Sequence, residues 1–194
     1  MGDETVKHNI LAEHLGPLGP LVGIWEGSEG IDVAPSSEPH GSAQSAFRER
    51  MCFEAFGPVC NGPQTLYGLR YSTTVWPLGE PEPFHEETGY WLWDKQREEV
   101  MRCFMVPRGV TVLAGGKAAS DASSFTMSAE LGSSCFGILS NPFLDENFRT
   151  VRYDVTITLN PDGSLSYHED TQLLIPSLPE PFHHTDCNRL LRKE

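Results

Sequence analysis

Apolar and polar residues alternate along most of this chain, and a period of two is typical of β-strands with one buried face. The clearest run covers residues 149–159. The sequence Asn-Pro-Asp-Gly follows at residues 160–163, and alternation resumes from Leu165 to Leu173. Proline presets φ for a turn and glycine accepts a positive φ. The two runs therefore predict an antiparallel β-hairpin.

Weaker runs of the same kind, bounded by Gly, Pro, Ser or Asn, fill much of the remaining chain. They cover residues 23–33, 47–55, 67–75, 85–93, 100–106, 110–114, 125–131 and 182–192. After the first fifteen residues no long segment keeps the spacing of an amphipathic helix, so no crossover helix separates these strands. Strands joined without crossovers form an antiparallel sheet.

About ten such strands could form either a two-sheet sandwich or a closed barrel. A closed barrel has no edge strands and suits strands joined by short turns. We therefore expect an all-β fold, a closed antiparallel β-barrel of about ten strands. A short N-terminal helical plug should close one end, because Leu15, Leu18 and Leu21 lie on a turn broken by prolines and Trp25 follows at the base.

The size of the chain fits a single domain. It has 194 residues, of which 39% are hydrophobic, and a chain of this length can bury a substantial core. We expect an N-terminal extension over residues 1–14 and one β-barrel domain over residues 15–194.

Charge and cysteine usage exclude several classes of protein. Lys and Arg number 14 against 27 Asp and Glu, a formal net charge of −13, which argues against nucleic acid or an anionic membrane as a partner. The five cysteines include no C-x-x-C pair, so neither a disulfide framework nor a structural zinc site is indicated. Residues 1–15 lack the apolar core of a signal peptide, and no stretch approaches ~18 apolar residues. We therefore expect a cytoplasmic protein.

Two motifs carry a family resemblance. Residues 23–30, Gly-Ile-Trp-Glu-Gly-Ser-Glu-Gly, resemble the G-x-W-x-G-x-x-G opening of the nitrobindin-like family, and residues 84–90, Phe-His-Glu-Glu-Thr-Gly-Tyr, resemble its H-x-E-T-G-Y segment. The resemblance spans most of the chain. It implies a ten-stranded barrel related in shape to fatty-acid-binding proteins and lipocalins. Members of its heme-binding branch hold ferric heme b and are associated with nitric oxide binding and isomerisation of peroxynitrite to nitrate.

The resemblance also implies two histidines at the heme. In the heme-binding branch a histidine on the last strand binds the iron, and the histidine of the H-x-E-T-G-Y segment, here His85, lines the pocket. The last strand of this chain departs from the family pattern. An ungapped match places Asp186 at the ligand position, and a shift of two residues places His184 there. A branch without this histidine has lost heme binding, and this chain could belong to it.

Alternation along the last strand favours His184 over His183. If Thr185 and Arg189 face solvent, then His184, Asp186 and Asn188 point into the barrel. A polar row inside a barrel is costly unless it is hydrogen-bonded, so it indicates a cavity lining. The alternative is a shifted register, in which this row faces solvent and the two histidines form a pair at the rim.

His85 shares its strand face with Trp91 and Trp93, and two indoles beside a histidine suit a flat aromatic ligand. The alternative is a plain aromatic core, with Glu86 and Glu87 as an exposed charge pair.

Three functions follow. The first is a ferric heme barrel, with His184 as the metal ligand and peroxynitrite isomerase activity if heme is bound. Its predicted cofactor-binding residues are His184, His85, Asp186, Asn188, Trp91 and Trp25. The second is a heme-free carrier of a small hydrophobic or amphipathic ligand. The third is a non-heme metal site of His184, Asp186 and His85. The expected partners are heme, nitric oxide, peroxynitrite or an apolar ligand, and a homodimer is the candidate assembly.

Overall fold

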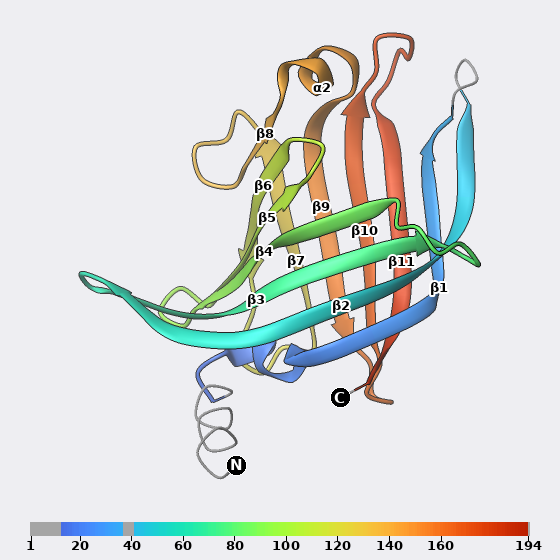
Figure 1. Cartoon of the computed structure of the whole chain (residues 1–194). Helices are drawn as coiled ribbons and strands as arrows, with labels where there is room; N and C mark the ends of the chain where they lie inside the picture. The colour runs from blue at the N-terminus through green and yellow to red at the C-terminus, as the bar shows by residue number, and fades with distance from the viewer. Residues whose placement is uncertain (1–12, 37–40, 194) are drawn as a thin grey trace.

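The chain forms a closed β-barrel with a short helix at each end (Figure 1). A computed structural model describes residues 13–36 and 41–193. Within them the elements follow the order η1 (Gly16–Leu21), β1 (Gly23–Pro35), β2 (Ser42–Asn61), β3 (Gln64–Pro77), β4 (His85–Asp94), β5 (Glu99–Val106), β6 (Val110–Lys117), β7 (Ser124–Leu131), β8 (Gly137–Ser140), α2 (Pro142–Asn147), β9 (Arg149–Leu159), β10 (Leu165–Leu174) and β11 (Phe182–Arg192). The predicted extension over residues 1–14 lies outside the described residues, except for its last two.

The strand order around the barrel is β1-β11-β10-β9-β7-β8-β6-β5-β4-β3-β2, and β1 closes the ring by pairing with β2. The prediction of an all-β closed barrel is confirmed. The expected hairpin is also present, since β9 and β10 pair antiparallel from Leu159↔Leu165 onward.

The described residues hold eleven strands, which agrees with the expected number of about ten. The sheet differs from the prediction in one detail, because β8 runs parallel to β7. This strand arises because β6 and β7 pair directly at only one position, Gly115↔Ser128, and diverge beyond it. The short β8 fills the gap by pairing with both neighbours. Four residues are too few to show an alternating pattern.

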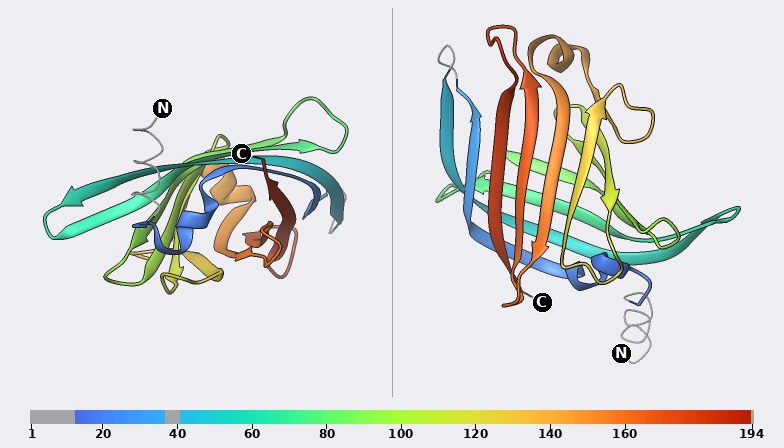
Figure 2. Two further views of the ribbon diagram at one scale, coloured as in Figure 1. Left: turned by 90° about the horizontal axis from the view of Figure 1, so that it is seen from below. Right: turned by 180° about the vertical axis from the view of Figure 1, so that it is seen from behind.

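The helical plug closes the end of the barrel at which β1 begins, and α2 lies at the opposite end (Figures 1 and 2). Leu15, Leu18, Leu21 and Trp25 are fully buried there. The Trp25 Nε1–H donates to the Leu21 carbonyl oxygen at 2.7 Å. The predicted plug therefore forms the dry base of the barrel. Separately, none of the helices in the described residues is long and apolar enough to cross a membrane.

The glycines of the first motif allow close packing of β1. The pairing of β1 shifts register between Gly27 and Gly30, which marks a β-bulge. A Cβ atom at Gly27 would lie only 2.3 Å from the carbonyl oxygen of Arg189 on β11. Any larger residue would push β1 and β11 apart at this point of the barrel wall.

Candidate functional site

A cavity of about 510 Å³ lies inside the barrel above the plug. This volume is within the range of small-molecule sites. One part of its wall is apolar, formed by Phe47, Val75, Phe104, Val112, Ile157 and Leu173. The other part is ionisable, formed by Asp32, Glu49, His85, Glu87, Arg102, Glu169, His184 and Asp186.

The last strand contributes the polar row that alternation predicted. His184 and Asp186 line the cavity, and Asn188 is 5% exposed. His183 lies on the outer face, where its Nδ1 is 2.8 Å from an Asp170 carboxylate oxygen. The alternative register, with the row facing solvent, is therefore wrong.

His184 is held against the cavity wall by a carboxylate. Its Nε2 is 2.8 Å from Asp32 Oδ1, which joins β11 to β1, and this is the ring's hydrogen bond among the described residues. The side chain is 34% exposed, so it remains accessible from the cavity. A carboxylate partner fixes the orientation and tautomer of an imidazole and leaves the other ring nitrogen available to bind a metal ion.

His85 faces the cavity from β4, which is separated from β11 in the ring by the three strands β3, β2 and β1. Its Nε2 is 3.2 Å from Glu87 Oε1. Burial lowers the pKa of His85, but the hydrogen bond and the charge of Glu87 outweigh it and raise this pKa above its usual value. The imidazolium form is therefore favoured.

Arg102 on β5 is the central cation of the cavity, and its side chain is 4% exposed. Its Nη2 donates to Glu87 Oε2 at 2.6 Å and its Nη1 to Glu169 Oε2 at 2.8 Å. The guanidinium also donates to the hydroxyls of Tyr71 and Tyr153. Burial raises the pKa of Glu87, but the charge of Arg102, together with His85 and Tyr71, lowers it to about 2. The Glu87–Arg102 pair is therefore ionised, and the reading of Glu87 as an exposed charge is wrong.

Among the described residues, the groups that donate hydrogen bonds to Glu49 on β2 are all neutral. Its carboxyl accepts hydrogen bonds from Thr73 Oγ1 at 2.8 Å, Tyr167 Oη at 2.9 Å and Asn188 Nδ2 at 3.1 Å. Burial raises the pKa of Glu49 more than these hydrogen bonds lower it.

Asp186 lies between two other acids. It is directly opposite Glu169 on β10 and Asp32 on β1. Burial, reinforced by the charges of Glu169, Glu49, Glu87 and Asp32, raises its pKa well above the usual value. Among the described residues its carboxyl has no hydrogen-bond partner.

The structure brings together four of the six predicted cofactor-binding residues: His184, His85, Asp186 and Trp91 all line the cavity. The other two lie outside its lining. Trp25 belongs to the plug because its indole packs at the closed end. Asn188 points inward one layer nearer the plug than Asp186, and its Nδ2 donates a hydrogen bond to Glu49 Oε2.

The predicted non-heme metal site is wrong. Among the residues that the structure describes, no three His, Cys, Asp or Glu side chains are grouped so that they could hold a metal ion. His184 is paired with Asp32, whereas His85 is paired with Glu87 on another wall.

Sequence reasoning missed Arg102 and Glu49, although a signal was present. Each is the charged member of an otherwise apolar inward face: Arg102 alternates with Val100 and Phe104, and Glu49 with Phe47 and Met51. A charge in such a series predicts a buried, paired group.

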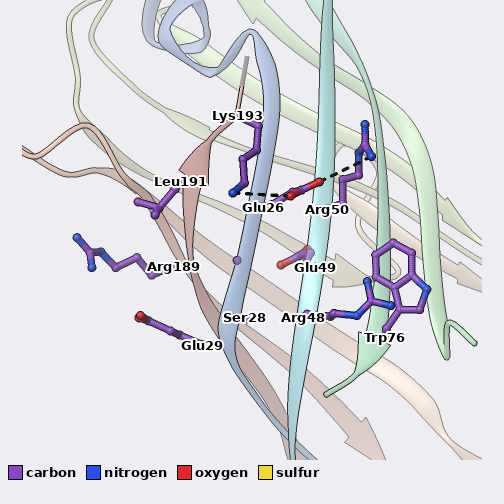
Figure 3. Close-up of a pocket in the computed structure, with 11 residues that line it drawn as sticks. Glu26, Ser28, Glu29, Arg48, Glu49, Arg50, Trp76, Arg189, Leu191 and Lys193 are labelled. Atoms are coloured by element: carbon purple, nitrogen blue, oxygen red, sulfur yellow. Dashed lines mark ion pairs between the residues drawn. The ribbon is translucent and has the colours of Figure 1, made fainter. Parts of the chain in front are cut away.

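A second hollow, of about 480 Å³, lies on the outside of the barrel at the β1 bulge (Figure 3). Arg48 stacks on Trp76 with its Cζ 4.1 Å from the ring centroid. The Glu26 carboxylate forms two ion pairs: Oε1 lies 3.7 Å from Arg50 Nη1, and Oε2 lies 3.9 Å from Lys193 Nζ. Much of the basic charge here is already paired, so the inner cavity is the stronger candidate site.

Three comparisons identify the relatives of this barrel. Residues 14–192 match the family model of the THAP4-like, heme-binding beta-barrel domain. Peroxynitrite isomerases of Clavibacter sepedonicus and Clavibacter michiganensis subsp. michiganensis are 36% and 34% identical over 83 residues. Each of these matches covers 42% of this chain and only 36% of the relative.

The crystal structure of Rv2717c from M. tuberculosis superposes with a TM-score of 0.65 at 20% identity, over 93% of this chain and 98% of that chain. At this identity the likeness shows a shared fold. The family match spans nearly the whole barrel, including both sequence motifs. The chain belongs to the family of THAP4-like, heme-binding β-barrel domains.

Proposed function

We propose that this barrel binds ferric heme b in its cavity, with His184 as the axial ligand of the iron. The observation that carries the proposal is the position of His184, which lines the cavity and is held by Asp32 at 2.8 Å. This carboxylate–histidine arrangement is the one that orients and strengthens imidazole ligands of metals. The family of the chain supports heme as the group bound.

The remaining walls also fit a porphyrin. Apolar side chains such as Phe104, Val112 and Ile157 suit its flat face. Arg108, in the turn between β5 and β6, lines the cavity and is exposed to solvent, so it offers a cation to a propionate group. Arg102 is unsuited to that role because Glu87 and Glu169 already neutralise it.

Heme bound through one histidine would supply an iron with an open position for nitric oxide or peroxynitrite. We propose peroxynitrite isomerisation as the activity because the two curated relatives carry that name. His85 lines the cavity from another wall, and Glu87 raises its pKa, which favours the protonated form that would offer a positive charge to an anion. Arg102 keeps Glu87 ionised and thereby supports His85.

A titration with hemin tests this proposal. The wild-type chain should give a saturable Soret band at a one-to-one ratio, and His184→Ala should abolish the specific band. His183→Ala is the matched control because His183 is the adjacent residue on the outer face, and its spectrum should equal the wild-type one. An unchanged spectrum in His184→Ala would overturn the assignment of the ligand. Absence of a specific band in the wild type would overturn heme binding itself.

A further inference from the structure

The interior of the barrel holds more carboxyl groups than cations. Five carboxyl side chains line the cavity: Asp32, Glu49, Glu87, Glu169 and Asp186. Arg102 is the buried cation among the lining residues, since Arg108 is exposed at the rim.

The buried cation and the two histidines of the cavity are already paired with carboxylates. Arg102 binds Glu87 and Glu169, and the two histidines bind Glu87 and Asp32. This leaves Glu49 with neutral donors alone and Asp186 with no hydrogen-bond partner among the described residues. Both carboxyls line the cavity.

The surplus of carboxyl groups over cations is costly because of the place of Asp186 in the sheet. Asp32, Asp186 and Glu169 are direct cross-strand neighbours on β1, β11 and β10, and all three line the cavity. Like charges opposite one another destabilise a sheet, and an unpaired buried charge is expensive. A positively charged ligand at this place would remove both costs.

The aromatic lining provides a second, independent observation. Trp91 is 2% exposed, it lines the cavity, and its indole N–H has no hydrogen-bond partner in the described structure. The rings around Arg102 already bind one cation: the guanidinium lies 4.5 Å from the centroid of Phe104 and 5.5 Å from that of Trp91. The unpartnered indole N–H is a donor, so it favours a ligand whose body presents an acceptor such as the face of an aromatic ring. The aromatic walls likewise favour an apolar or aromatic body, while the carboxyl groups favour the positive charge.

We infer that the floor of the cavity, one layer below His184, binds an organic cation, an ammonium group carried on an aromatic or apolar body. The ammonium would be recognised by Asp186 and Glu49, and the body would contact Phe104, Val112 and Ile157. An anionic ligand such as a fatty acid is disfavoured there, because two glutamates already neutralise Arg102.

This inference goes beyond the proposed heme function. Heme depends on His184, whereas the cation depends on Asp186 and Glu49, so each can fail without the other. Both ligands would occupy one cavity of about 510 Å³, and we expect them to compete.

Three indole probes of similar shape and different charge test the inference by isothermal titration calorimetry at pH 7: tryptamine, the neutral tryptophol and the anionic indole-3-propionate. Tryptamine should bind at least tenfold more tightly than either analogue. Asp186→Asn should weaken tryptamine at least tenfold and leave tryptophol unchanged. Glu54→Gln, an exposed acid on the outer face of β2, should bind tryptamine like the wild type.

Equal or tighter binding of tryptophol or indole-3-propionate would overturn the inference, as would a tryptamine affinity that is insensitive to Asp186→Asn. No binding of any probe would overturn it too. Thermal unfolding of Asp186→Asn separates lost binding from lost folding. We expect this variant to be at least as stable as the wild type, because it removes the middle one of three neighbouring acids. His184→Ala should keep tryptamine binding while it loses the Soret band, which distinguishes the two proposals.

Discussion

At the scale of single residues, the buried carboxyls fall into two groups with opposite effects on stability. Glu87 faces Arg102 and His85, and its pKa is lowered to about 2, so its charge is stabilised by folding. Glu49 and Asp186 have no such cation, and their pKa values are raised, so their charges oppose folding. The difference arises from the partner that each strand places opposite the acid, because all three carboxyls line the same cavity.

Glu49→Gln should therefore stabilise the protein at pH 7, by roughly 1 kcal/mol. The amide keeps the hydrogen-bond pattern: its oxygen can accept from Tyr167 and Asn188, and its NH₂ group can donate to Thr73 Oγ1, whose hydroxyl also lies 3.4 Å from the Arg50 carbonyl. Urea denaturation of the variant and the wild type measures the gain.

The stability gained by Glu49→Gln should become smaller as the pH falls. A raised carboxyl pKa means that the folded state binds its proton more tightly than the unfolded state. The penalty is fully present above the folded pKa of Glu49, and it disappears as the pH falls toward the ordinary value of 4.5. The advantage of the variant should shrink over the same range. A variant that is less stable than the wild type at pH 7 would contradict this account of Glu49.

At the scale of elements, Arg102 connects strands that lie far apart in the sheet. From β5 its guanidinium reaches Glu87 on β4, Tyr71 on β3, Tyr153 on β9 and Glu169 on β10. Tyr71 and Tyr153 each donate to the neighbouring glutamate at 2.6 Å, which closes the network. The barrel is therefore braced across its interior as well as hydrogen-bonded around its wall.

Removing this brace should be strongly destabilising. Arg102→Met leaves the Glu169 carboxylate without its cation and Glu87 with His85 alone, and breaking a buried ion pair in this way costs about 3–5 kcal/mol. Adding Glu87→Gln and Glu169→Gln to Arg102→Met should recover most of the loss, because no unpaired charge remains. Chemical denaturation of the single and triple variants measures both effects. If the triple variant is no more stable than the single one, the loss stems from packing and not from charge.

The strands themselves were largely predictable from the sequence, for a physical reason. Regular alternation marks β9 and β10, and the turn at residues 160–163 sets their register, so pattern alone placed this hairpin. The four-residue β8 carries no pattern, and its parallel pairing depends on the divergence of β6 from β7. The motif glycine Gly89 has a reason that only the structure reveals: a Cβ atom there would lie 1.9 Å from the Cys103 carbonyl oxygen of β5.

At the scale of the whole molecule, the barrel combines a dry base with an ionisable cavity. The plug and Trp25 fill one end completely, and the polar groups begin in the layers above it. Alternation on the last strand was enough to predict that His184 and Asp186 face inward. It could not predict the Arg102 network, because that network joins residues from five strands whose proximity is created by closure of the barrel.

The central claim is that His184 binds the heme iron from the wall of this cavity. The most direct test is chemical rescue: His184→Gly is titrated with hemin in the absence and presence of free imidazole. We predict no specific Soret band without imidazole, and recovery of a wild-type-like band when imidazole fills the space left by the side chain. A wild-type band in His184→Gly without imidazole, or a lost band that imidazole fails to restore while the variant remains folded, would contradict the claim.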